Sequence, residues 1–190
     1  MENVLAGVLV ILLAVATLTG CGKSEAAEGP KSTKESRVAR GKYLVSVLGC
    51  NDCHTPLKMG PKGPERDFSR LLSGHPQQLS VGEAPKVPEP WMMTMVSTGT
   101  AFAGPWGTTF AMNLTPDVNT GIGIWTEDIF MNAIRDGRHW GQSRPIMPPM
   151  PWDVYRNLTD EDLKSVYAFL RTIPPISNRV PEYRPPVEKE

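Results

Sequence analysis

Residues 50–54 of this chain read Cys-Asn-Asp-Cys-His, and this short segment constrains the fold more than any other. Two cysteines separated by two residues and followed directly by a histidine form the attachment motif of c-type haem. The thiols can form thioethers with the two vinyl groups of one haem, and His54 is then held where its imidazole can ligate the iron as proximal ligand. The motif therefore predicts one covalent haem c bound through Cys50, Cys53 and His54.

Two other interpretations of the cysteine pair fit this sequence poorly. A thioredoxin-like pair follows a buried strand in a βαβ pattern, whereas residues 38–49 read as a helix and no βαβ alternation follows. A structural zinc site needs four ligands, usually as two spaced pairs, and the chain has three cysteines with no second pair. Haem attachment is the interpretation that the motif favours.

The N-terminal segment predicts export and a lipid anchor. Residues 4–18 are almost wholly aliphatic, and the following Leu18-Thr19-Gly20-Cys21 resembles a bacterial lipobox, in which the signal peptide is cut before a cysteine that becomes lipidated. This apolar segment is shorter than an ordinary membrane span, which needs about 20 residues. The first three residues lack the usual basic charge, which leaves an uncleaved anchor as the alternative. We expect a lipoprotein signal peptide over residues 1–20, lipidation of Cys21, and a location on the periplasmic side of a bacterial membrane.

Composition sets the remaining bounds on organisation. Residues 21–36 are polar and aperiodic and predict a flexible tether, which leaves residues 37–190 as one domain. Twenty basic and twenty acidic residues balance, so nothing indicates a nucleic-acid partner. Glycine and proline number 17 and 19, which is typical of a globular domain with long ordered loops.

Three segments of the domain show helical signals. Residues 37–48 have one apolar side and lead into Cys50. Thr126 is a suitable N-cap for a helix over residues 127–136, which Gly137 would end. Thr159 caps the third helix, whose apolar stripe runs to Leu170 before two prolines. Residues 56–125 show no clear periodicity, and within them residues 92–96 are either a short strand or a segment at the haem edge.

This order of elements resembles class I cytochromes c, in which one helix enters the haem motif, a middle helix flanks the pocket and a last helix crosses the first. The resemblance covers residues 37–58 and 104–175. The segments Asn-Leu-Thr-Pro-Asp at 113–117, Thr-Gly-Ile-Gly at 120–123 and Pro-Pro-Met-Pro at 148–151 look like those of cytochrome subunits of membrane dehydrogenases. The resemblance implies a mainly α, class I cytochrome c-like domain around one haem, with a long irregular loop insertion.

The resemblance also implies the distal iron ligand, because class I cytochromes c use a methionine from a proline-rich loop before the last helix. That position is Met150, which has proline on both sides, whereas the alternative Met147 has proline only after it. His75 and His139 offer bis-histidine ligation instead. Tryptophan side chains, Arg138 and Asn113 are candidate hydrogen-bond partners for the haem carboxylates, although packing on the ring is the commoner role of tryptophan.

A thioether ligand favours Fe(II) and raises the reduction potential, which suits an electron carrier rather than an enzyme. We therefore expect single-electron transfer between redox proteins of a respiratory or dehydrogenase system, with a membrane-bound dehydrogenase or a terminal oxidase as candidate partners. The alternative is a haem protein with an open sixth position, such as a peroxidase or a gas sensor.

Overall fold

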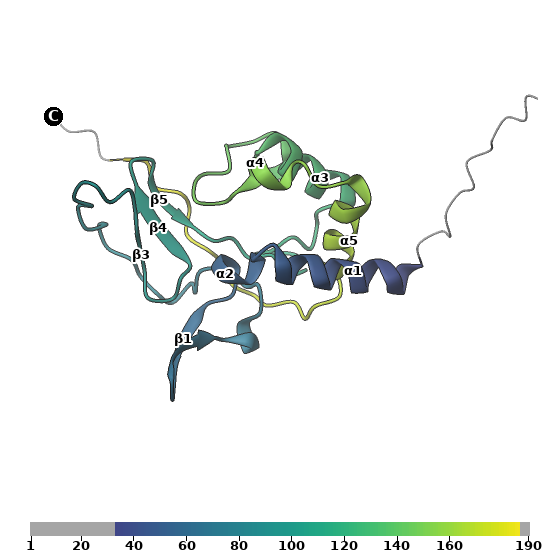
Figure 1. The fold of residues 1–190 in the computed structure, drawn as a ribbon, viewed down its shortest axis with the longest axis horizontal. Coiled ribbons are helices and arrows are strands. Elements are labelled where there is room, and N and C mark those ends of the chain that lie inside the picture. Colours follow the sequence, from purple (N-terminus) through teal and green to yellow (C-terminus); the bar gives the residue numbers. More distant parts are fainter. Residues whose placement is uncertain (1–32, 187–190) are drawn as a thin grey trace, which may run out of the picture. The chain divides into compact units, whose positions relative to one another are not determined.

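The computed structural model describes residues 33–186 (Figure 1). Within them lie the helices α1 (Lys34–Val47), α2 (Cys50–His54), α3 (Glu127–Asp136), α4 (Trp152–Tyr155) and α5 (Asp160–Leu170), the strands β1 (Leu57–Gly60), β2 (Gly63–Arg66), β3 (Thr94–Met95), β4 (Ala101–Gly104) and β5 (Gly107–Phe110), and the 3-10 turns Phe68–Arg70 and His139–Gly141. The predicted signal peptide over 1–20, Cys21 and the tether up to residue 32 lie outside the described residues. No helix of the described part is long and apolar enough to cross a membrane.

The three predicted helices are confirmed, with one changed boundary. The side chain of Thr33 accepts a hydrogen bond from Ser36 N, so α1 begins at Lys34 and residues 34–36 are helical rather than part of the tether. The predicted N-caps of α3 and α5 are correct, since Thr126 accepts from Ile129 N and Thr159 accepts from Asp162 N. Caps act within one turn of helix, which is why a sequence can indicate them.

The expectation of a mainly α domain with an irregular insertion is only partly met. The insertion, which is the stretch of residues 56–125, contains a two-stranded antiparallel sheet, β1–β2, and a three-stranded antiparallel sheet in the order β3–β4–β5. The strand interpretation of residues 92–96 is confirmed, because Thr94 and Met95 pair with Ala103 and Phe102. These strands have two to four residues. Such strands are too short to show the alternating pattern that identifies a strand in a sequence.

The helical core forms where α1 meets α5 (Figure 1). Many of its buried members come from α1, α3, α5 and the segment before α3: Leu44, Val45, Ile122, Trp125, Phe130, Val166 and Leu170. Gly41 of α1 lies at the contact, where a Cβ would fall 1.8 Å from the Ser165 carbonyl oxygen. The two helices can therefore approach closely, and α1 carries the chain to the haem motif.

Candidate haem site

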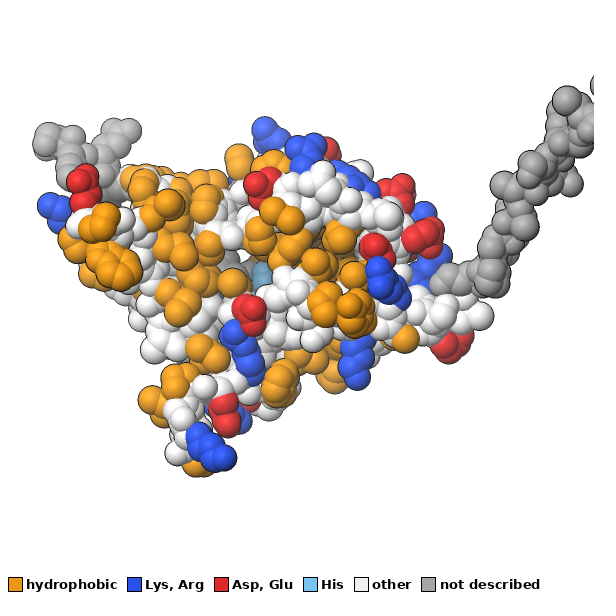
Figure 2. Space-filling view, in the orientation of Figure 1, with side chains coloured by type: hydrophobic (Ala, Val, Ile, Leu, Met, Phe, Trp, Pro, Cys, Tyr) orange, Lys and Arg blue, Asp and Glu red, His pale blue; other side chains and the backbone are white. Residues whose placement is uncertain are grey.

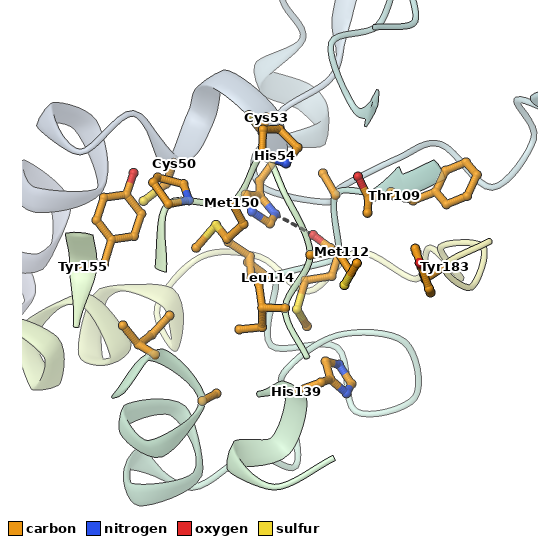
Figure 3. Close-up of a pocket in the computed structure, with 18 of the residues that line it drawn as sticks. Cys50, Cys53, His54, Thr109, Met112, Leu114, His139, Met150, Tyr155 and Tyr183 are labelled. Carbon is orange, nitrogen blue, oxygen red and sulfur yellow. Dashed lines mark hydrogen bonds between the residues drawn. The ribbon is translucent and has the colours of Figure 1, made fainter. Parts of the chain in front are cut away.

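The haem motif forms a helix of its own, α2, directly after α1. The chain turns between the two helices at Gly49, whose φ of 71° is left-handed. A side chain at this position would be strained, and its Cβ would lie 2.8 Å from a carboxylate oxygen of Asp52. The turn aims Cys50, Cys53 and His54 into one cavity (Figure 3).

His54 is buried, with 8% of its surface exposed. Its Nδ1 lies 2.8 Å from the Met112 carbonyl oxygen. A carbonyl can only accept, so Nδ1 carries the proton and Nε2 keeps its lone pair for a metal. Burial lowers the pKa of His54 and outweighs this hydrogen bond, which acts in the opposite direction. The lowered pKa favours the neutral ring, which is the form that ligates iron.

Groups from the insertion bind the carbonyls at the end of α2. The helical partner of Asp52 O would be the N–H of residue 56, but residue 56 is proline and has none. Arg66 of β2 supplies the donor instead: its guanidinium donates to Asp52 O at 2.8 Å, to Thr55 O at 3.3 Å and to the Asp52 carboxylate at 2.9 Å. The β1–β2 hairpin therefore holds the haem motif in place.

The two motif cysteines are free thiols that line the same cavity as His54. Burial raises the pKa of the Cys50 thiol to about 11, and burial also raises the pKa of Cys53. A reactive redox pair has a lowered thiol pKa. The buried thiols therefore do not fit a thioredoxin-like role.

The cavity has an empty volume of about 1150 Å³, part of it open to solvent. Figure 2 shows hydrophobic side chains around a hollow in which a histidine is visible. The lining is mostly apolar and comes from α2, β4, β5, the segment 111–125, α3 and the loop before α4. It includes Phe102, Ala111, Met112, Leu114, Ile122, Trp125, Phe130 and Ile146. A large apolar cavity with two thiols and the free Nε2 of His54 on its wall fits a haem with thioether links and a histidine ligand.

The structure places three of the four candidate distal ligands on the cavity wall. Met150 lines the cavity (Figure 3). Met147 lines it too, so the choice of Met150 stays a prediction. His139 also lines it, with its ring packed edge-on against Trp125. His75 is fully buried elsewhere, and its two nitrogens bind Thr100 Oγ1 at 2.9 Å and Leu79 O at 3.0 Å. His75 therefore has no nitrogen to offer an iron.

Two candidates for the haem carboxylates have other hydrogen-bond partners, and neither is among the residues that line the cavity. The side chain of Asn113 is used within the fold, where its amide donates to Ile176 O at 2.7 Å and its carbonyl accepts from Thr115. Arg138 is exposed and donates to Ser143 O at 2.9 Å. Arg144, which the sequence argument did not single out, lines the cavity instead, as does Trp125.

Sequence reasoning also missed the Met112 carbonyl, Arg66 and Thr109, which all act from the insertion. Thr109 lines the cavity and its hydroxyl donates to Pro148 O at 2.8 Å. Pro56 is the one available signal among them, because a proline so soon after the motif removes a helical donor that another group must replace.

Comparisons with known proteins agree with this geometry. A family model described as cytochrome c matches residues 38–174. The chain is 30% identical over 143 residues to the fructose dehydrogenase cytochrome subunit of Gluconobacter japonicus, an alignment that covers 75% of this chain and 22% of that subunit. It is 28% identical over 155 residues to the gluconate 2-dehydrogenase cytochrome c subunit of Pantoea cypripedii, covering 81% and 27% of the two chains.

A third relative is the cytochrome c subunit of the quinone-type alcohol dehydrogenase of Gluconobacter oxydans (strain 621H), with 27% identity over 152 residues that cover 78% of this chain and 24% of the relative. The chain thus spans about a quarter of the length of these relatives. The family match covers most of the domain, and with it come covalent haem c and a role in electron transfer. This chain belongs to the cytochrome c family.

Proposed function

We propose that this protein is a mono-haem electron carrier in which His54 and Met150 are the two axial ligands of the iron. One observation carries the proposal: the two motif cysteines, His54 and the proline-flanked Met150 line one cavity, while His75 is bound on both ring nitrogens elsewhere. When bound, the haem supplies a reversible Fe(III)/Fe(II) couple.

The residues of the chain would keep this iron six-coordinate. His54 presents Nε2 because Nδ1 is bound to Met112 O. A thioether from Met150 on the opposite side would favour Fe(II) and raise the potential. The apolar lining of the cavity excludes water from the iron and disfavours the extra charge of Fe(III), which acts in the same direction.

Single substitutions in the haem-loaded protein test the ligand set. Met150→Ala should remove the far-red charge-transfer band of a methionine-bound Fe(III), lower the reduction potential and let the iron bind carbon monoxide. Met147→Ala and His139→Ala are the matched controls, because both residues line the same cavity, and both should leave the band in place.

The outcomes separate the alternatives. Loss of the band in Met147→Ala but not in Met150→Ala would transfer the ligand to Met147. A parent protein without the band whose spectrum changes in His139→Ala would indicate bis-histidine ligation. Ready binding of carbon monoxide by the parent would favour the open-site alternative.

The proposed setting is the periplasmic side of a bacterial membrane, with lipid on Cys21, a tether beyond it, and a dehydrogenase as electron donor. The Leu-Thr-Gly-Cys segment at 18–21 supports the anchor, and the printed names of the relatives support the donor. Cys21→Ser should move the haem protein from the detergent phase to the aqueous phase, and unchanged partitioning would favour an uncleaved anchor. Reduction of the haem by a dehydrogenase with its substrate, followed by absorbance, checks the donor.

A further inference from the structure

The loop that carries Met150 is poor in the groups that normally hold a loop in place. Residues 144–151 read Arg-Pro-Ile-Met-Pro-Pro-Met-Pro, so four of the eight have no N–H. Ile146 N donates to Gly137 O at 2.8 Å. After Ile146, one other N–H group of the loop makes a main-chain hydrogen bond in the described chain. This bond runs from Met150 N to Met147 O within the loop itself, and at 3.4 Å it is long. Apart from the bond of Ile146, main-chain hydrogen bonds from this loop to the rest of the fold must therefore use its carbonyl oxygens.

Thr109 supplies a donor for one of these oxygens. It lies on β5, in the part of the sequence that shows no periodicity, and its hydroxyl donates to Pro148 O at 2.8 Å. The hydroxyl also lies 3.3 Å from Phe102 O on the neighbouring strand. A hydroxyl has one proton, so the shorter contact to Pro148 is the stronger hydrogen bond.

The position of this bond relates it to the iron ligand. Pro148 is two residues before Met150, and Thr109 faces the cavity that both methionines line (Figure 3). Thr109 is 9% exposed. Without its hydroxyl, the Pro148 carbonyl would lose a partly buried hydrogen bond, and because Pro148 itself is exposed, the free carbonyl would favour loop positions in which it binds solvent. The same displacement would draw Met150 away from its place on the cavity wall and so weaken a bond to the iron.

We infer that Thr109 is a positioning residue that holds the Met150 loop against the haem and thereby sets the strength of the thioether–iron bond. The inference rests on the proposed His54/Met150 ligation. It gives the β3–β4–β5 sheet a function, because the sheet carries the donor that a proline-rich loop cannot provide for itself.

Thr109→Val tests the inference, because valine keeps the shape of threonine and removes the hydroxyl. Thr108→Val is the matched control: Thr108 is equally exposed at 9%, points to the other face of the strand, and bonds to Arg184 through its main chain. Thr109→Ser keeps the hydroxyl. The measurement is a titration of the haem-loaded Fe(III) protein with imidazole, which competes with a methionine for the sixth position.

Thr109→Val should bind imidazole about 5-fold more tightly than the parent, which is the effect of one net hydrogen bond of roughly 1 kcal/mol. Thr108→Val and Thr109→Ser should bind it like the parent, and all four proteins should melt within a few degrees of one another.

Equal affinities in Thr109→Val and the parent would overturn the inference, and so would equal gains in Thr108→Val and Thr109→Val, because those indicate general loosening. If Thr109→Val does not hold haem, a Thr109→Ser protein that binds imidazole more tightly than the parent overturns it as well. A parent without the methionine charge-transfer band refutes the ligation proposal itself, and this outcome is visible before any variant is made.

Discussion

The crossing of α1 and α5 makes a strong prediction for Gly41→Ala. Gly41 is buried within α1, and a Cβ there would lie 1.8 Å from Ser165 O, 2.5 Å from Ser165 C and 2.8 Å from Phe169 Cβ. The nearest atoms belong to the backbone of α5, so they cannot rotate away as a side chain would. The new methyl group must push the two helices apart.

The size of the effect follows from two opposing terms. A carbon and a carbonyl oxygen in close contact sit about 3.3 Å apart, so the helices must separate by roughly 1.5 Å at this point. Overpacking of this kind costs about 1–3 kcal/mol, and a backbone clash belongs at the upper end. Alanine regains about 1 kcal/mol through its higher helix propensity. The net loss should be about 2 kcal/mol, or roughly 4–8 °C in melting temperature for a domain of this size.

Thermal unfolding of the haem-loaded protein, followed by far-ultraviolet circular dichroism, measures this change. Ala39→Gly is the control, because Ala39 is exposed on the same helix and its replacement changes helix propensity alone, by about 1 kcal/mol in the destabilising direction. If Gly41→Ala raises the melting temperature, propensity dominates, and the close approach of α1 to Ser165 would be refuted.

Three further predictions concern groups that stabilise the fold. Arg66→Gln should lower the unfolding free energy by about 2 kcal/mol, because Asp52 O and Thr55 O lose a charged donor. Denaturant titration measures this change, and an unfolding midpoint equal to that of the parent would contradict the prediction. Burial lowers the pKa of His75 below its ordinary 6.5. The imidazole of His75 therefore binds a proton more readily in the unfolded chain than in the folded protein. The stability that neutral His75 contributes is present above about pH 6.5 and is lost as the pH falls below this value. His75→Gln should flatten the decline of melting temperature between about pH 6.5 and 5, and an unchanged slope would assign that decline to other groups. Thr126→Ala should cost about 1 kcal/mol by removing the cap on Ile129 N, measured by the same titration, whereas no loss would mean that the cap is dispensable.

Features that depend on neighbours in sequence could be predicted from the sequence. The haem motif places three groups within five residues, and the resulting helix α2 does aim them into one cavity. The caps of α3 and α5 act across three residues, so Thr126 and Thr159 were identifiable. The proline-flanked Met150 was identifiable as a candidate for the same reason, and it does line the cavity.

Only the tertiary structure decided the roles that depend on distant residues. In the sequence, His75 and His139 are both isolated histidines in loops. Contacts with Thr100 and Leu79 occupy the first, whereas the second reaches the cavity. Asn113 belongs to the same group, because its partner Ile176 lies 63 residues away.

The functional contacts of the insertion were also invisible in the sequence. Its strands are too short for a periodic signal, yet they bring Arg66 to the carbonyls of α2 and Thr109 to the ligand loop. A hydrogen bond across 39 residues, such as that from Thr109 to Pro148, leaves no local pattern. Its geometry arises only when the sheet and the loop have packed around the same cavity.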